Sequence, residues 1–148
     1  MRCMFKIVAL LILFIVSESA AETLTLQVSQ LRSLKGNLII YLWHNPNAYL
    51  MKSGANHKVV VDLEQPQNTP VNGAIHVKIE GLQHKAYAMM LYHDENRSYS
   101  FERNLVGIPM EGFAFGNNAR PNLGAPKFQE AAIHLLQPEV VQHIKVLY

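Results

Sequence analysis

A two-residue alternation of apolar and polar side chains runs through most of the chain beyond residue 22. Leu24, Leu26 and Val28 alternate with threonine and glutamine, which predicts a half-buried strand. The same period, or a short β-branched run, recurs at residues 38–43, 58–63, 75–79, 86–93, 131–135 and 141–148. No stretch beyond residue 22 keeps a 3.6-residue period over about three turns, so we expect an all-β fold. Residues 47–57 are the one place where we expect a short helical turn.

About seven short strands separated by turn signals are typical of a single antiparallel β-sandwich of immunoglobulin or prealbumin-like kind. A small closed barrel is the alternative architecture. Segment 38–43 is apolar on both faces, which predicts a central strand. Residues 64–73 are polar and rich in Pro, Asn and Gly, which predicts a loop.

The segment from Asp94 to Lys127 has little alternation and many Gly, Pro and Asn residues. It also carries Phe101, Phe113 and Phe115, so its composition is not that of a disordered linker. Loops of this length inside a compact domain are usually functional or disordered. We therefore expect one long ordered loop, packed over one end of the sandwich and carrying the binding residues.

The first 21 residues have the order of parts of a secretory leader. Arg2 and Lys6 precede the apolar run at 7–16, and small residues follow at 17–21. A run of this length is too short to span a bilayer core, which needs about 20 apolar residues. We expect cleavage after Ala21, a periplasmic or secreted domain at residues 22–148, and no permanent membrane anchor.

Composition removes several classes of function. Cys3 is the only cysteine and lies in the predicted leader, so the mature domain is expected to lack disulfides, thiolate metal sites and cysteine nucleophiles. The net charge of +2 and the absence of a basic run argue against nucleic-acid binding.

Several motifs in the second half of the chain lie in a distinctive order. They are HDEN at 93–96, GIPMEGF at 107–113, FGNN at 115–118 and GAPKF at 124–128. In this order and spacing the chain resembles an uncharacterised family of exported bacterial proteins, domain of unknown function 2141. The resemblance implies a periplasmic or secreted sandwich and no established activity. The turn after His93-Asp94 departs from the family habit, because it lacks a glycine, contains Arg97, and has Glu102 where a last aspartate is expected.

That turn is the candidate metal site. Asp94, Asn96 and Ser98 alternate, as the early ligands of a calcium loop do, and Glu102 can complete the set. A sharp calcium loop needs glycine at its sixth position, which is Tyr99 here. The competing interpretation is a turn in which Asp94 and Asn96 accept bonds from backbone amides. No cofactor is expected, although calcium is possible at this turn; a transition-metal site is not favoured, since the seven histidines show no metal-ligand spacing.

The remaining hypotheses concern the long loop. A hydrolase would use His93 with Glu111, but no nucleophile motif accompanies them. A binding site would combine aromatic and amide side chains; the candidate ligand-binding residues are His93, Asp94, Asn96, Glu111, Phe113 and Asn117. The expected function is an exported binding or envelope-associated module for an unknown small-molecule, glycan or protein ligand. The alternatives are a metal-binding periplasmic protein and the hydrolase; the sequence leaves catalysis open and favours a non-enzymatic role.

Overall fold

The computed structural model describes residues 21–148, so the predicted leader lies almost wholly outside the described residues. Its eight strands are β1 (Glu22–Ser29), β2 (Asn37–Trp43), β3 (His57–Asp62), β4 (Ala74–Leu82), β5 (Ala86–Asp94), β6 (Gly112–Phe115), β7 (Ala132–His134) and β8 (Glu139–Lys145). The helical segments are four 3₁₀ turns, η1 (Pro46–Ala48), η2 (Lys52–Gly54), η3 (Pro66–Asn68) and η4 (Gly116–Asn118), and the single turn α1 (Phe128–Ala131). No helix within residues 21–148 is long and apolar enough to cross a membrane.

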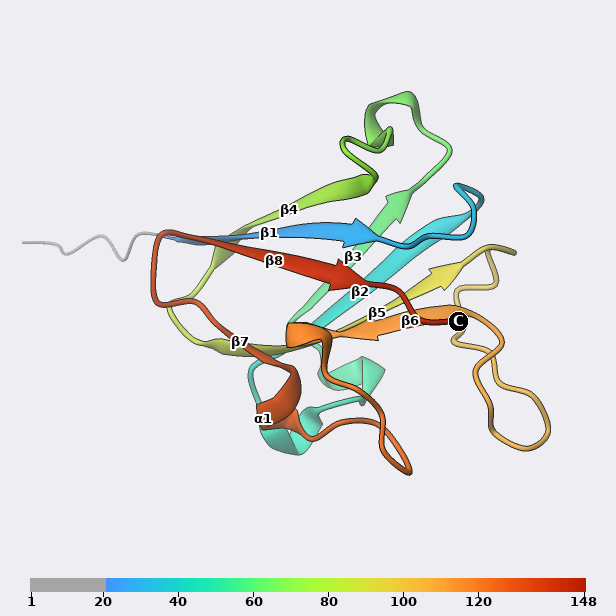
Figure 1. Cartoon of the computed structure of the whole chain (residues 1–148). Helices are drawn as coiled ribbons and strands as arrows, with labels where there is room; N and C mark the ends of the chain where they lie inside the picture. The colour runs from blue at the N-terminus through green and yellow to red at the C-terminus, as the bar shows by residue number, and fades with distance from the viewer. Residues whose placement is uncertain (1–20) are drawn as a thin grey trace, which may run out of the picture.

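The strands form two sheets packed face to face (Figure 1). The first, sheet A, has the order β4-β1-β8. The second, sheet B, has the order β3-β2-β5-β6, and β7 extends it by pairing with β5. The predicted all-β sandwich is thereby confirmed.

One strand pair departs from the antiparallel expectation. β1 and β8 run parallel, with Thr25 opposite Val141 and Val28 opposite Ile144. A parallel pair needs a crossover connection rather than a hairpin. The chain supplies it by passing from β7 in sheet B to β8 in sheet A, so β8 enters its sheet from the same end as β1.

The core between the sheets follows the predicted alternation. Burial in β1 alternates strictly along the strand, and Leu24, Leu26 and Val28 are fully buried. They pack against the inward side chains of β2 and β5, such as Ile40 and Leu91. Fully burying an aliphatic side chain contributes about 1.5–3 kcal/mol, so this layer supplies most of the stabilisation.

The predicted long loop contains the strand that the sequence pattern does not show. β6 is only four residues long, and its pairing places Phe113 opposite Tyr92 and Phe115 opposite Met90. Ala114 faces the core between the sheets. Four residues between glycines are too few to display an alternation, which is why the count of about seven strands falls one short.

The outer face of sheet B is apolar as well, because β2 carries Ile39, Tyr41 and Trp43 on that side and all three are buried. Three connections cover this face: residues 44–56, 95–111 and 119–131. They contribute partly buried side chains that include Tyr49, Phe101 and Phe128.

Gly36, just before β2, is held where no side chain fits. Its φ is +71°, and a Cβ atom there would lie 2.1 Å from the Asp94 carbonyl oxygen. Gly73 has a similar φ of +77° but open space around it. A side chain at Gly73 would therefore cause backbone strain alone, whereas a side chain at Gly36 would cause the same strain and a steric clash.

We predict that Gly73→Ala lowers the free energy of unfolding by about 1 kcal/mol, the cost of placing a side chain at positive φ. Gly36→Ala should lower it by at least about 3 kcal/mol, because overpacking against rigid backbone adds to the same strain. Urea denaturation measures both values. Equal losses in the two variants would contradict the close approach of Gly36 to β5.

Candidate functional site

His93, predicted to face a ligand, is fully buried and bonded at both ring nitrogens. Its Nε2 atom lies 2.8 Å from the Lys35 carbonyl oxygen, and its Nδ1 atom lies 2.6 Å from the Tyr148 hydroxyl. A carbonyl only accepts, so in the neutral ring Nε2 carries the hydrogen and Nδ1 accepts from Tyr148. The imidazole therefore connects β5, the chain before β2 and the last residue of the sequence.

Asp94 organises the turn that follows β5. Its carboxylate oxygens accept bonds from the amides of Ser98 and Tyr99, each at 2.9 Å. Asn96 also accepts from the Ser98 amide, and its side-chain nitrogen donates to Glu102 at 3.1 Å. These bonds hold Tyr99 at a φ of +57°, a conformation that a side chain seldom adopts.

All four candidate calcium ligands thus lie in this turn, where Asp94, Asn96 and Glu102 bond to neighbouring groups of the chain. Ser98 donates its hydroxyl to the Ser100 carbonyl oxygen. Within residues 21–148 no group of three or more His, Cys, Asp or Glu side chains is arranged to hold a metal ion. Calcium binding stays a prediction.

Arg97 fixes the far side of the turn. Its guanidinium donates to Asp62 at 2.8 Å and to Asn37 at 3.2 Å, which ties the turn to β3 and β2. The hydrogen bond from Arg97 lowers the pKa of Asp62 to about 2. Arg97 is therefore an anchor of this turn.

Glu111 fixes the base of the long loop. One carboxylate oxygen accepts from the Glu102 amide at 3.1 Å, and the other is buried without a partner. Burial, reinforced by the charges of Asp94, Glu102 and Glu95, raises the pKa of Glu111 to about 7. His93 and Glu111 have separate partners and share no hydrogen bond, so the catalytic pairing gains no support from the geometry.

Asn117 and its neighbour Asn118 act as braces between elements. The Asn117 amide donates to the carbonyl oxygens of Glu130 and Ala132. Asn118 accepts from the Lys145 amide and donates to the His143 carbonyl oxygen, both at 2.8 Å. Of the six candidate ligand-binding residues, Phe113 is the one that lines a cavity.

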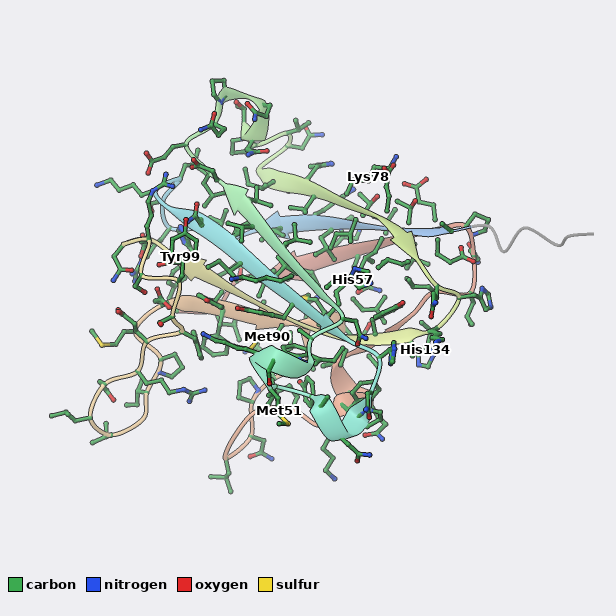
Figure 2. All side chains as sticks on the ribbon, turned by 180° about the vertical axis from the view of Figure 1, so that it is seen from behind. Met51, His57, Lys78, Met90, Tyr99 and His134 are labelled. Carbon is green, nitrogen blue, oxygen red and sulfur yellow. The ribbon has the colours of Figure 1, made fainter. Side chains whose placement is uncertain are left out.

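That cavity belongs to a groove on the outer face of sheet B. One part, of about 150 Å³, is lined by Tyr41, Trp43, Leu50, Lys52, Met90, Tyr92, Phe101, Arg103, Phe115 and Ala125. The second, of about 250 Å³, is lined by Phe101, Arg103, Val106, Gly107, Ile108, Pro109, Phe113, Phe115, Pro121, Gly124 and Ala125. Four residues are common to both parts, so the two adjoin, and we call them together the outer groove. In Figure 2 Met90 lies against the segment with η1 and η2 that forms one wall.

Aromatic rings run the length of the outer groove. Tyr41 stacks on Trp43 with ring centroids 5.6 Å apart and on Tyr92 at 6.4 Å. The series continues from Tyr92 to Phe101 at 5.5 Å and from Phe101 to Phe113 at 5.9 Å. Such pairs fix ring orientation, which gives the groove a preformed apolar floor.

The charged groups of the outer groove are few, and both are cationic. Lys52 places its ammonium 5.9 Å from the centre of the Tyr92 ring, and the Arg103 guanidinium lies 5.0 Å from that of Phe101. No carboxylate is among the lining residues of the described chain. The Tyr92 hydroxyl is buried without a hydrogen-bond partner, and burial raises its pKa.

Most residues of this groove carry no signal in the sequence that marks them as a site. Tyr41 and Trp43 were visible as the second apolar face of β2, which indicated a central strand. That pattern indicates that both faces of β2 are buried. It does not show which loops cover the outer face, because those loops are far apart in the sequence.

We predict that Tyr148→Phe lowers the free energy of unfolding by about 2 kcal/mol, because it removes the partner of a buried imidazole nitrogen. Chemical denaturation measures the change. Tyr99→Phe, at a half-exposed ring, is the matched control and should change stability by less than about 0.5 kcal/mol. A neutral Tyr148→Phe variant would refute the bridging role of His93.

The raised pKa of Glu111 predicts a pH-dependent stability. The folded state holds this proton up to about pH 7, whereas the unfolded chain releases it near the ordinary value of 4.5. The free energy of unfolding of the wild type should therefore fall as pH rises from 4.5 to about 7. The ionisation of Glu111 accounts for up to about 3 kcal/mol of that fall. Glu111→Gln should not show that part of the fall, whereas Glu139→Gln, at an exposed position, should keep it. Parallel wild-type and Glu111→Gln profiles in urea denaturation would contradict the burial of this carboxyl.

Comparison with known proteins places the chain in a family. No curated protein and no solved structure matches it significantly. One family model, described as "Uncharacterized protein conserved in bacteria (DUF2141)", matches residues 26–143, which run from the second half of β1 to most of β8. The chain therefore belongs to this uncharacterised bacterial family.

Proposed function

We propose that this protein is an exported, non-catalytic binding module. Its outer groove holds an amphiphile, a ligand with an apolar body and an anionic group at one end. The observation that carries the proposal is the lining of the groove: stacked aromatic rings, two cationic side chains and no carboxylate. Small-molecule sites are typically apolar cavities with a few placed polar groups, which is the composition found here.

The chemistry of the lining favours an amphiphile over a glycan. Buried sugar hydroxyls need hydrogen-bond partners, because an unpaired buried hydroxyl costs about 1–3 kcal/mol. The lining side chains supply few such partners besides Lys52 and Arg103. These two cations suit a carboxylate, sulfate or phosphate at one end of an apolar body.

The same lining favours binding without catalysis. General acid–base or nucleophilic chemistry needs a base, an acid or a nucleophile within hydrogen-bond reach of the substrate. The side chains of the groove lining that can carry such chemistry are Lys52, Tyr41 and Tyr92, and the lining includes no His, Ser, Thr, Cys, Asp or Glu to activate them. The export of the module rests on the predicted leader at residues 1–21.

Trp43 makes the proposal directly testable, because it is the single tryptophan of the chain and lines the groove. We predict that dodecanoate, below its micellar concentration, changes Trp43 fluorescence in residues 22–148 saturably. The double variant Lys52→Gln/Arg103→Gln should weaken dodecanoate binding about tenfold, the loss of roughly one charge-assisted hydrogen bond. It should leave the binding of neutral dodecanol unchanged.

Two further variants complete the test. Ala125→Phe, at an exposed position shared by both parts of the groove, should block dodecanoate and dodecanol alike. Lys78→Gln removes a cation from β4 in sheet A, on the side opposite Met51 in Figure 2, and should change neither. A Trp43 signal that responds to no amphiphile, or that Ala125→Phe leaves intact, would overturn the proposal.

A further inference from the structure

Two loop tips below sheet B present large apolar side chains to solvent. The first tip is formed by residues 104–108, in which Leu105 is fully exposed and Val106 is 78% exposed. The second is formed by residues 122–124, in which Leu123 is also fully exposed. We call these the 105 tip and the 123 tip. A soluble surface seldom exposes such side chains completely and together unless they meet a partner.

The two tips project from the same side of the molecule. In Figure 1 both hang below the sheets, away from β4 and the η3 loop, and Figure 2 shows the same arrangement from behind. They also flank one feature, since Val106 and Ile108 of the first loop and Pro121 and Gly124 of the second line the same part of the outer groove. The apolar tips are therefore neighbours with a common direction.

The 105 tip is ordered by its own hydrogen bonds. The Asn104 side chain accepts from the amides of Val106 and Ile108 at 3.1 and 2.9 Å. The Arg103 guanidinium donates to the Gly107 carbonyl oxygen at 3.1 Å. These bonds satisfy the polar backbone inside the loop and leave Leu105 and Val106 pointing outward.

The exposed charges of the loops that carry the tips are cationic. These are Arg103, Arg120 and Lys127, whereas the neighbouring acidic residues Glu102 and Glu130 lie where the loops join the sandwich and Glu111 is buried. A partner surface with negative charge would be attracted to this side over a distance of about 10 Å at ordinary salt.

We infer that the two tips dock the domain reversibly on an anionic lipid surface, with Leu105, Val106 and Leu123 entering the boundary between headgroups and acyl chains. Narrow tips with fully exposed apolar side chains offer little flat area to a folded protein, but each fits between lipid headgroups. Membrane-surface binding combines buried apolar area with attraction of basic residues to anionic lipid, and both are present here. The inference is independent of what occupies the outer groove.

Sedimentation with lipid vesicles tests this docking. Protein comprising residues 22–148, which contain every strand of both sheets, avoids insertion through the predicted leader. It should bind phosphatidylcholine vesicles that contain phosphatidylglycerol, bind pure phosphatidylcholine at least about fivefold more weakly, and lose affinity as salt rises. Leu105→Ser/Leu123→Ser should weaken binding to the anionic vesicles about tenfold or more, because two exposed leucines no longer enter the lipid.

The matched control is Val71→Ser, which removes an exposed apolar side chain from the loop above β4, on the opposite side. It should bind like the wild type, and equal melting temperatures show that all variants fold. In Leu123→Trp, the emission that exceeds the Trp43 signal of the wild type should shift to shorter wavelength on the anionic vesicles, because the new indole enters an apolar layer. Absence of vesicle binding, or binding that the double serine variant leaves unchanged, would overturn the inference. So would self-association that the same variant abolishes, since a second copy would then be the partner.

Discussion

The fold depends on the need to cover both faces of β2. Its inward side chains, such as Leu38 and Ile40, meet sheet A, and its outward side chains, such as Tyr41 and Trp43, are equally buried. In a two-layer sandwich only the inward face is covered by the other sheet. The outward face therefore requires the three connections that wrap beneath sheet B. The outer groove is the space that those connections leave between them.

The polar residues at and after the end of β5 hold one of the connections that cover the outer face of β2. Asp94 and Arg97 shape the turn, and Glu111 receives the Glu102 amide at the base of the loop. Glu102 also pairs through its backbone with Met110, so the flanking Phe101 and Arg103 are set in place over the sheet. The residues that the sequence offered as a ligand site thus hold the loop that forms the groove. A change in this cluster should affect binding through the position of the loop.

The strands with one apolar face could be predicted from the sequence. An alternation of apolar and polar residues, such as that of β1 or β4, is typical of a strand that buries one face and exposes the other. β6 could not be predicted, since four residues carry too little pattern, and the parallel pairing of β8 follows from a crossover between sheets. At the Asp94 turn the sequence left calcium and amide capping open; the structure shows the amide bonds and leaves calcium untested. The outer groove joins residues of β2, β5, β6 and three connections. The two-faced pattern of β2 and the phenylalanines of the long loop hinted at it, but neither reveals where a covering layer is incomplete.

If the outer groove is the binding site, ligands meet the outer face of sheet B and not the turn at Asp94. The most direct measurement is a titration of isotope-labelled protein with dodecanoate, followed by amide and indole NMR shifts. Trp43 supplies a reporter within the groove, because its indole nitrogen donates to the Met51 carbonyl oxygen at 2.9 Å. The account predicts saturable shifts of that indole signal and of the Phe101, Arg103 and Ala125 amides, with the Ser98 and Tyr99 amides unmoved. Shifts confined to Ser98 and Tyr99, with a silent indole, would contradict it.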